Sequence, residues 1–315
     1  MKKIPMDIQR KIQGGNGLLI FWRLLKYSFV NIKRNDPLRM AGATAFFTTF
    51  ALPPILIILF QLFSLFLSKR LVGAQMMEIF TDTLGKGSAI QIRQTTRGFG
   101  TLARNWYISV GGFLFLVFVA TTLFSVIKNS LNEIWNIRVK DKPGILFNLR
   151  LRARSLGIIL VAGLLFLAGI FMDGFQILSG NYLEKIWPMG GRYFKGALNE
   201  IVSAIIVTTW FIVLFRYLAD GRPSWRVAIS GGCLTGVLFS AGKAVLSFLM
   251  RNSNINTLYG ASGSIVLILL FVFYSSFILY FGASFIKVYA EAIQQPFRLV
   301  NKAFRYQLRE LDEVE

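Results

Sequence analysis

The stretch that decides the fold is WRVAISGGCLTGVLFSAGKAVLSFLM (residues 225–250) followed by RNSNINTLYG (residues 251–260). An apolar run of about 20 residues is long enough to cross a bilayer as a helix. The polar segment is short and leads into a second apolar run that extends past Ala283. We therefore expect two membrane-spanning helices joined by a brief turn.

Small residues recur at every fourth position of the first run, at Gly232, Gly236, Ser240 and Ala244. Because a helix turns about 100° per residue, they form a stripe along one side, and Lys243 lies about 20° from Gly232. Such stripes let helices pack closely, either within one chain or between copies in a homo-oligomer. Close packing is the favoured interpretation. It places the positive charge of Lys243 on a face that contacts another helix.

The composition extends this apolar pattern to nearly the whole chain. Hydrophobic residues make up 54% of the 315 positions and charged residues only 16%, which is typical of an integral membrane protein. The expected fold class is all-α, a polytopic membrane protein with six transmembrane helices. The predicted spans cover residues 38–67, 106–127, 155–178, 197–218, 226–250 and 260–288.

Two polar ends flank this membrane domain, which we assign to residues 37–290. In the N-terminal segment, residues 1–36, bulky apolar side chains alternate with lysine and arginine between positions 18 and 34. That mixture suits an amphipathic helix that lies in the headgroup plane. Residues 291–315 form a polar tail of mixed charge.

The first span begins at Asp36-Pro37, because an aspartate caps a helix and proline is tolerated at the first helical position. Pro53 and Pro54 interrupt it. A proline inside a helix removes a hydrogen bond and clashes with the preceding turn, so we expect a kink or break there. A packed kink is the favoured interpretation, and a broken helix that lines a cavity is the alternative.

The formal net charge of +20 indicates a membrane surface as the partner. Lysine and arginine lie mostly beside apolar runs, and no folded basic domain with a stacking platform for nucleic acid is visible. They are more numerous on the side that carries both ends of the chain, so both termini are predicted to be cytoplasmic. The expected partners are anionic membrane lipids and no nucleic acid. The candidate lipid-binding cations, whose alternative role is to set orientation alone, are Lys140, Lys142, Arg150, Arg152 and Arg154.

The chain offers little for catalysis. It has no histidine, its one cysteine, Cys233, lies in an apolar run, and its acidic residues are scattered. Metal-dependent hydrolysis needs clustered carboxylates or histidines, and a nucleophilic enzyme needs an activated side chain beside a base. We therefore expect no enzymatic activity, no catalytic residue, no metal and no cofactor.

Lys243 is the candidate for a polar site between helices. It lies in the outer half of its span, and helical side chains tilt toward the N-terminus, here the cytoplasmic direction. Snorkelling to the outer surface, the alternative, works against that tilt. An inward-facing lysine needs an anion. Asp173 and Glu200, expected near the outer ends of the third and fourth spans, are the candidates.

Four short segments occur in a specific order: ATAFF (residues 43–47), LNEIW (131–135), PSWR (223–226), and TLYGA (257–261), which runs on toward GAS (282–284). Together they resemble the YihY/BrkB family of bacterial inner-membrane proteins. The family-motif residues are Trp135, Pro223, Trp225, Arg226, Tyr259, Gly260 and Gly282. The resemblance implies six spans, cytoplasmic termini and a multi-pass protein of the bacterial inner membrane. It implies no defined chemistry, since the ribonuclease label once attached to the family looks like a misassignment.

Two functional hypotheses follow. The first is an inner-membrane transporter or a translocase for lipids or other amphiphiles, with a polar site between helices that attracts anionic cargo. The second is a membrane scaffold or envelope-assembly factor that moves nothing, in which the proline pair and Lys243 only assist packing. The sequence does not identify a cargo or a coupling ion.

Overall fold

The computed structural model describes residues 17–63, 106–139, 188–252, 263–300 and 303–307, with isolated positions between 73 and 94 and between 157 and 165. Its long helices are α2 (Gly17–Lys33), α3 (Pro37–Phe63), α5 (Trp106–Ile134), α7 (Pro188–Tyr217), α8 (Trp225–Asn252) and α10 (Gly263–Ala292). Its short strands are β1 (Ile137–Val139), β2 (Gly221–Arg222), β3 (Arg298–Leu299) and β4 (Ala303–Arg305).

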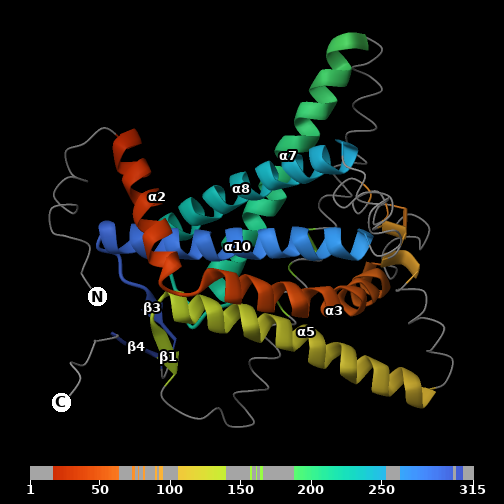
Figure 1. Cartoon of the computed structure of the whole chain (residues 1–315), viewed down its shortest axis with the longest axis horizontal. Coiled ribbons are helices and arrows are strands. Elements are labelled where there is room, and N and C mark those ends of the chain that lie inside the picture. Colours follow the sequence, from red (N-terminus) through yellow and green to blue (C-terminus); the bar gives the residue numbers. More distant parts are fainter. Residues whose placement is uncertain are drawn as a thin grey trace.

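Helix α10 is the central element of the bundle. It packs against α3, α8, α2 and α5, while α7 packs against α8 and α3 against α5. Figure 1 shows α10 in blue across the middle, with α8 on one side and α3 and α5 on the other, and α7 crossing α8 steeply. Helix α2 and the strands gather at the C-terminal end of α10. This is also the end at which the core is most fully buried.

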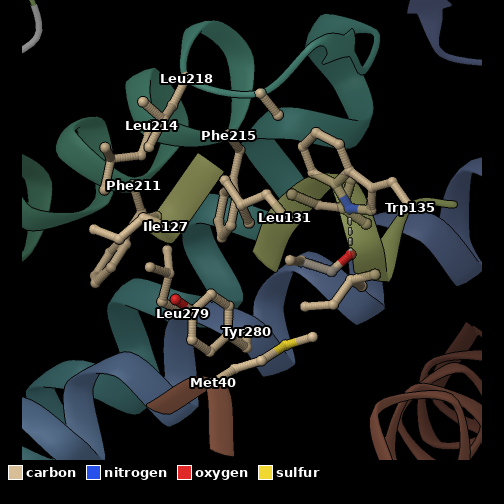
Figure 2. Packing of buried hydrophobic residues seen from close by; sticks show 14 of the residues in the cluster. Met40, Ile127, Leu131, Trp135, Phe211, Leu214, Phe215, Leu218, Leu279 and Tyr280 are labelled. Atoms are coloured by element: carbon tan, nitrogen blue, oxygen red, sulfur yellow. Dashed lines mark hydrogen bonds between the residues drawn. The ribbon is translucent and has the colours of Figure 1, made fainter. Parts of the chain in front are cut away.

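The core is an aromatic and aliphatic cluster between the ends of α5, α7 and α10. Trp135, Phe215 and Tyr280 have the largest fully buried side chains in it, and Figure 2 shows them meeting across the three helices. The indole Nε1 of Trp135 donates to the carbonyl of Ala283 at 2.9 Å. That bond satisfies the polar atom of a large buried side chain, as burial requires.

Close approach of α8 and α10 depends on a missing side chain. A Cβ placed on Gly282 would run into the Oγ1 of Thr235 and lie 3.1 Å from the ring of Phe215. Thr235 is fully buried and its hydroxyl donates to the carbonyl of Gly231 at 2.7 Å. The β-branched threonine is therefore held in place and has little freedom to give way.

The helices of the described region agree with the expected class, and three of them are long and apolar enough to cross a membrane. These stretches are Glu200–Tyr217, Trp225–Leu246 and Val266–Ala292. They overlap the predicted fourth, fifth and sixth spans, and the last extends beyond the predicted end at residue 288. Helix α3 begins at Pro37, as expected. The predicted third span lies almost wholly outside the described residues. The count of six spans and the side on which the termini lie stay predictions.

The described residues are mostly helical, and two short strand pairs add to the expected all-α class. Strand β1 pairs with β4, and β2 pairs with β3, both antiparallel. Strands β3 and β4, which lie in the segment expected as a polar tail, thus pair with the chain that follows α7 and α5. No sequence pattern predicts these pairs, because strands of two or three residues are too short for periodicity and their partners lie far apart along the chain.

We predict that Gly282→Ala lowers the free energy of unfolding by about 1–3 kcal/mol, because overpacking a tight contact costs that much. Thermal unfolding of the detergent-purified chain, followed by tryptophan fluorescence, measures the effect. Gly42→Ala is the matched control, since a Cβ there meets nothing within 4 Å and alanine favours the helix. Equal melting temperatures for the Gly282→Ala and native chains would contradict the packing argument.

Candidate functional site

The most unusual feature of the bundle is a buried ion pair at the end of α5. The Nζ of Lys128 lies 2.9 Å from the Oδ2 of Asp220, and each side chain is only 6% exposed. Asn132, one turn after Lys128, donates its Nδ2 to the same Oδ2 at 2.8 Å and accepts the backbone N–H of Asp220 at 3.0 Å. These contacts join α5 to the turn between α7 and α8.

Lys287 forms a second buried charged site beside the first. This residue of α10 is 3% exposed. Its Nζ donates to the carbonyl of Ile134 at 2.8 Å, to the Oδ1 of Asn136, and to the Oδ1 of Asn31 at 3.4 Å. The three donors of the ammonium group therefore all find acceptors. The carbonyl is at the C-terminal end of α5, where the helix dipole favours a cation.

The local sequence explains why α5 ends where Lys287 can reach it. Asn136 adopts a left-handed conformation, with φ of 55°, which asparagine tolerates better than most residues. Its N–H donates to the carbonyl of Glu133 at 3.1 Å and closes the last turn. The chain then enters β1, and the side-chain carbonyl of Asn136 is left to accept from Lys287.

Hydrogen bonds extend this site to the N-terminal helix α2. Asn31 donates its Nδ2 to the Oγ of Ser284 at 2.8 Å, and that hydroxyl donates to the carbonyl of Ser28 at 2.8 Å. Both serines are fully buried. Helix α2 is therefore fixed to α10 by polar contacts as well as by the apolar side chains of Leu24 and Phe285.

We call these two networks together the polar seam. It ties the ends of α2, α5, α7 and α10 together at the level of the strand pairs. Its members are Asn31, Lys128, Asn132, Asn136, Asp220, Ser284 and Lys287.

The structure does not bring Lys243 and Glu200 together as the predicted ionic site requires. Lys243 is partly buried on α8, whereas Glu200 is exposed on α7. No ion pair joins the two among the residues that the structure describes, and Asp173 lies outside them. Helices α7 and α8 cross steeply, so they separate on either side of their contact. Lys243 stays a candidate without an identified anion.

The stripe of small residues meets α7 at its first two members. A Cβ on Gly232 would collide with Ile212, and one on Gly236 with Thr208. Ser240 is partly buried and Ala244 is exposed. Each fourth position is rotated by about 40° around the helix axis relative to the one before it. A stripe of this spacing therefore winds away from a straight neighbouring helix within about three turns.

The other predicted site residues have varied surroundings. Trp135 and Gly282 lie in the core, Pro223 is buried, and Trp225 and Arg226 are exposed. Pro53 and Pro54 lie within α3, which continues from Pro37 to Phe63, and their side chains are outside the described set. Also outside the described residues are Lys140, Lys142, Arg150, Arg152, Arg154, Tyr259 and Gly260.

The comparisons with known proteins identify the family. The sequence pattern of the family described as Virulence factor BrkB matches residues 28–305. The chain belongs to the BrkB family.

Curated relatives of this BrkB-family chain are named UPF0761 membrane protein. The one from Teredinibacter turnerae is 26% identical over 291 residues, covering 92% of this chain and 65% of the relative. That from Saccharophagus degradans is 25% identical over 257 residues, covering 80% and 56%. That from Pseudomonas aeruginosa is 26% identical over 264 residues, covering 84% and 61%. The chain thus spans less than two thirds of the length of these relatives, and no solved structure matches it.

Sequence reasoning missed the polar seam, although some signals for it were present. Lys128 and Asn132 lie four residues apart, and Trp135 three further on, so all three share one face of a helix. Asp220 is the one acid in an arginine-bearing turn, and Lys287 interrupts an apolar run. Nothing in the sequence indicated that these residues, so far apart along the chain, would meet.

The chemistry of the seam is that of a joint between helix ends. Its charges are paired or fully hydrogen-bonded, which is the condition for burying them. Within the described part of the chain, no group of three or more His, Cys, Asp or Glu could hold a metal ion. The seam joins helix ends through an ion pair and hydrogen bonds, and water molecules could take the place of these contacts.

We predict that Lys128→Met destabilises the chain by about 3–5 kcal/mol, because it leaves the Asp220 carboxylate buried without its counterion. The double variant Lys128→Met/Asp220→Asn should lose much less, since no unpaired charge is left behind and the amide keeps a hydrogen-bonding group beside Asn132. Unfolding midpoints of the native chain, both single variants and the double variant measure this coupling. Strictly additive effects would contradict a direct ion pair.

Proposed function

We propose that this BrkB-family chain is a multi-pass inner-membrane transporter or translocase for anionic or amphiphilic cargo. In this proposal it has no enzymatic activity, and the polar seam is its closed gate on the cytoplasmic side. The observation that carries the proposal is the buried Lys128–Asp220 pair, with its two nearly inaccessible charges. The pair lies just beyond the predicted ends of two spans, at residues 127 and 218, where a closure would stand at the mouth of a path between the helices.

The physical reason to favour a gate lies in the energetics of such a pair. A buried ion pair adds little stability compared with apolar side chains of the same volume, because both charges lose their hydration. When the pair separates into water, the charges regain that hydration. A polar closure can therefore open and shut at modest cost, whereas an apolar closure would expose hydrophobic surface.

The position of the seam also supports a gate. It connects α5 to the turn after α7 through Asp220, and α5 to α10 through Lys287. Opening it would free the ends of three helices at once. Lys243 lies further along α8 on the face that bears Gly232 and Gly236, where a cation could attract an anion entering from the opposite side.

The alternative function is a membrane scaffold that moves nothing. The complete set of hydrogen bonds around Lys287 favours it, since a fully satisfied network also serves as a permanent joint. The two functions differ in whether the seam ever opens, which flux measures directly.

We predict that Lys128→Gln/Asp220→Asn lowers flux through the chain in proteoliposomes, because the closure keeps its shape but its opening no longer returns two charges to water. Efflux of small anions and transbilayer movement of fluorescent anionic lipid are both measured. Arg39→Gln/Glu133→Gln is the matched control, since it removes an ion pair of 3.2 Å at the same end of the bundle whose side chains are exposed and add little stability. If neither the native chain nor the double variant moves any cargo faster than protein-free vesicles do, the transport proposal fails and the scaffold is favoured.

Accessibility along α8 gives an independent prediction. Because Cys233 is the chain's one cysteine, Cys233→Ala provides a background for single cysteines at Ser240, Lys243 and Val237. A transporter should let a charged, water-soluble maleimide reach Lys243→Cys and Ser240→Cys. Val237→Cys, at a side chain that is 68% exposed on the outer surface of α8, should stay protected by lipid.

Labelling that stops before Lys243 would favour the scaffold. Lys243→Met should also reduce anion flux without lowering the melting temperature. Unchanged flux, stability and growth in that variant would remove Lys243 from the proposed path.

A further inference from the structure

Four arginines meet at one corner of the bundle, around the turn between α7 and α8. Arg216 is in the last turn of α7, Arg222 is in β2, Arg226 is in the first turn of α8, and Arg298 is in β3. We propose that this corner binds the phosphate of an anionic phospholipid, with the acyl chains lying along the exposed face of α8.

The strand register places two of these positive charges directly opposite each other. Arg222 pairs with Arg298 across the β2–β3 ladder, and both side chains are exposed. Residues directly opposite in an antiparallel pair have their Cβ atoms about 5 Å apart, and like charges there are destabilising. A bound anion between the two guanidinium groups would turn this repulsion into attraction.

The acids of the described residues form no ion pair with this corner. Asp220, the acid of this turn, is buried and paired with Lys128. Among the described residues, no ion pair connects any of the four arginines to an aspartate or glutamate. The α8 N-terminus adds the positive end of its helix dipole at Trp225, which also favours an anion.

Arg216 has an unfilled hydrogen-bonding position. One terminal nitrogen, NH1, donates to the carbonyl of Pro223, and the guanidinium lies 5.1 Å from the centre of the Trp225 ring. Its Nε is buried and has no hydrogen-bond partner in the described structure. An orphaned donor of this kind is costly unless an acceptor reaches it. A phosphate oxygen that enters beside Trp225 would supply that acceptor.

The surroundings favour a lipid over a free phosphate. Trp225 is 52% exposed and stacks edge-on against Tyr217, the kind of aromatic pair that lies at the level of lipid headgroups. From Trp225, an exposed stripe continues along α8 through Ile229, Cys233 and Val237. Phosphate-binding arginines thus stand at the head of an apolar surface long enough for acyl chains. A scaffold could carry this site as well as a transporter, so it does not depend on the proposed gate.

The test measures lipid binding to the whole 315-residue chain and requires no flux measurement. The purified chain in detergent is titrated with phosphatidylglycerol, with phosphatidylcholine and with inorganic phosphate, and its melting temperature is followed. A ligand that binds only the folded state raises this temperature increasingly as its concentration exceeds its Kd. We expect a rise with phosphatidylglycerol that exceeds those with the other two.

Arg222→Gln/Arg298→Gln should weaken the apparent affinity for phosphatidylglycerol by about tenfold or more, because charge-assisted hydrogen bonds are lost. In phosphatidylcholine alone the same variant should melt no lower than the native chain, since it also removes a repulsion. Arg138→Gln/Arg305→Gln is the matched control. It removes two arginines from the neighbouring β1–β4 pair, where they oppose Phe304 and Ile137, and should keep the native affinity.

Arg226→Gln, at an exposed position, provides a single change that leaves the strands intact and should weaken binding by several-fold. Three results would overturn the proposal. The first is that phosphatidylglycerol raises the melting temperature of both the Arg222→Gln/Arg298→Gln and Arg226→Gln variants as much as that of the native chain. The second is that the control variant loses as much affinity for phosphatidylglycerol as the Arg222→Gln/Arg298→Gln variant. The third is that inorganic phosphate raises the melting temperature of the native chain as much as phosphatidylglycerol does.

Discussion

The end of α5 constrains the whole bundle, because charged groups there are buried and must find partners. Lys128 and Asp220 can be buried in a site that is almost closed to water only if α5 and the turn after α7 remain together. Lys287 imposes the same condition on α10, since its ammonium group depends on acceptors from α5 and α2. The apolar core beside them, with Trp135 and Phe215 at its centre, excludes water and makes each of these contacts stronger.

The C-terminal segment extends this constraint beyond the helices. Strand β3 holds the α7–α8 turn and β4 holds the chain leaving α5, so a single stretch fixes the two connections that border the polar seam. The N–H of Val300 also donates to the carbonyl of Asp220 at 2.9 Å. The position of that acid is thus set by backbone as well as by side chains. A joint of this kind suits either a gate that opens as a unit or a rigid scaffold.

The polar seam and the arginine corner share one turn but have opposite electrostatic conditions. In the seam, Asp220 balances Lys128 and both are removed from water. At the corner, Arg222 and Arg298 face solvent and are not balanced by an acid of the described chain. The first arrangement needs nothing from outside the protein, whereas the second gains from an anion, and a membrane surface supplies anions as lipid phosphates.

The sequence by itself determined the elements that local pattern controls. Apolar runs located α7, α8 and α10, Asp36-Pro37 marked the start of α3, and the mixed apolar and basic stretch indicated α2. The spacing of Gly232 and Gly236 predicted a contact face, because helical periodicity depends only on neighbours along the chain. The resemblance to the BrkB family likewise depended on short motifs in a fixed order.

Only the tertiary structure decided which charges are buried and with what. Lys128, Asp220 and Lys287 are ordinary residues at the ends of apolar runs, and their partners lie on other helices. The sequence did not indicate the two strand pairs either, since β1 and β4, and likewise β2 and β3, lie far apart along the chain. Conversely, Lys243 stood out in the sequence as the one lysine within its apolar run. It forms no ion pair with an acid of the described chain, because α7 and α8 cross rather than run side by side. Local periodicity fixes a side chain's direction on its own helix, whereas the identity of its neighbour depends on how the helices cross.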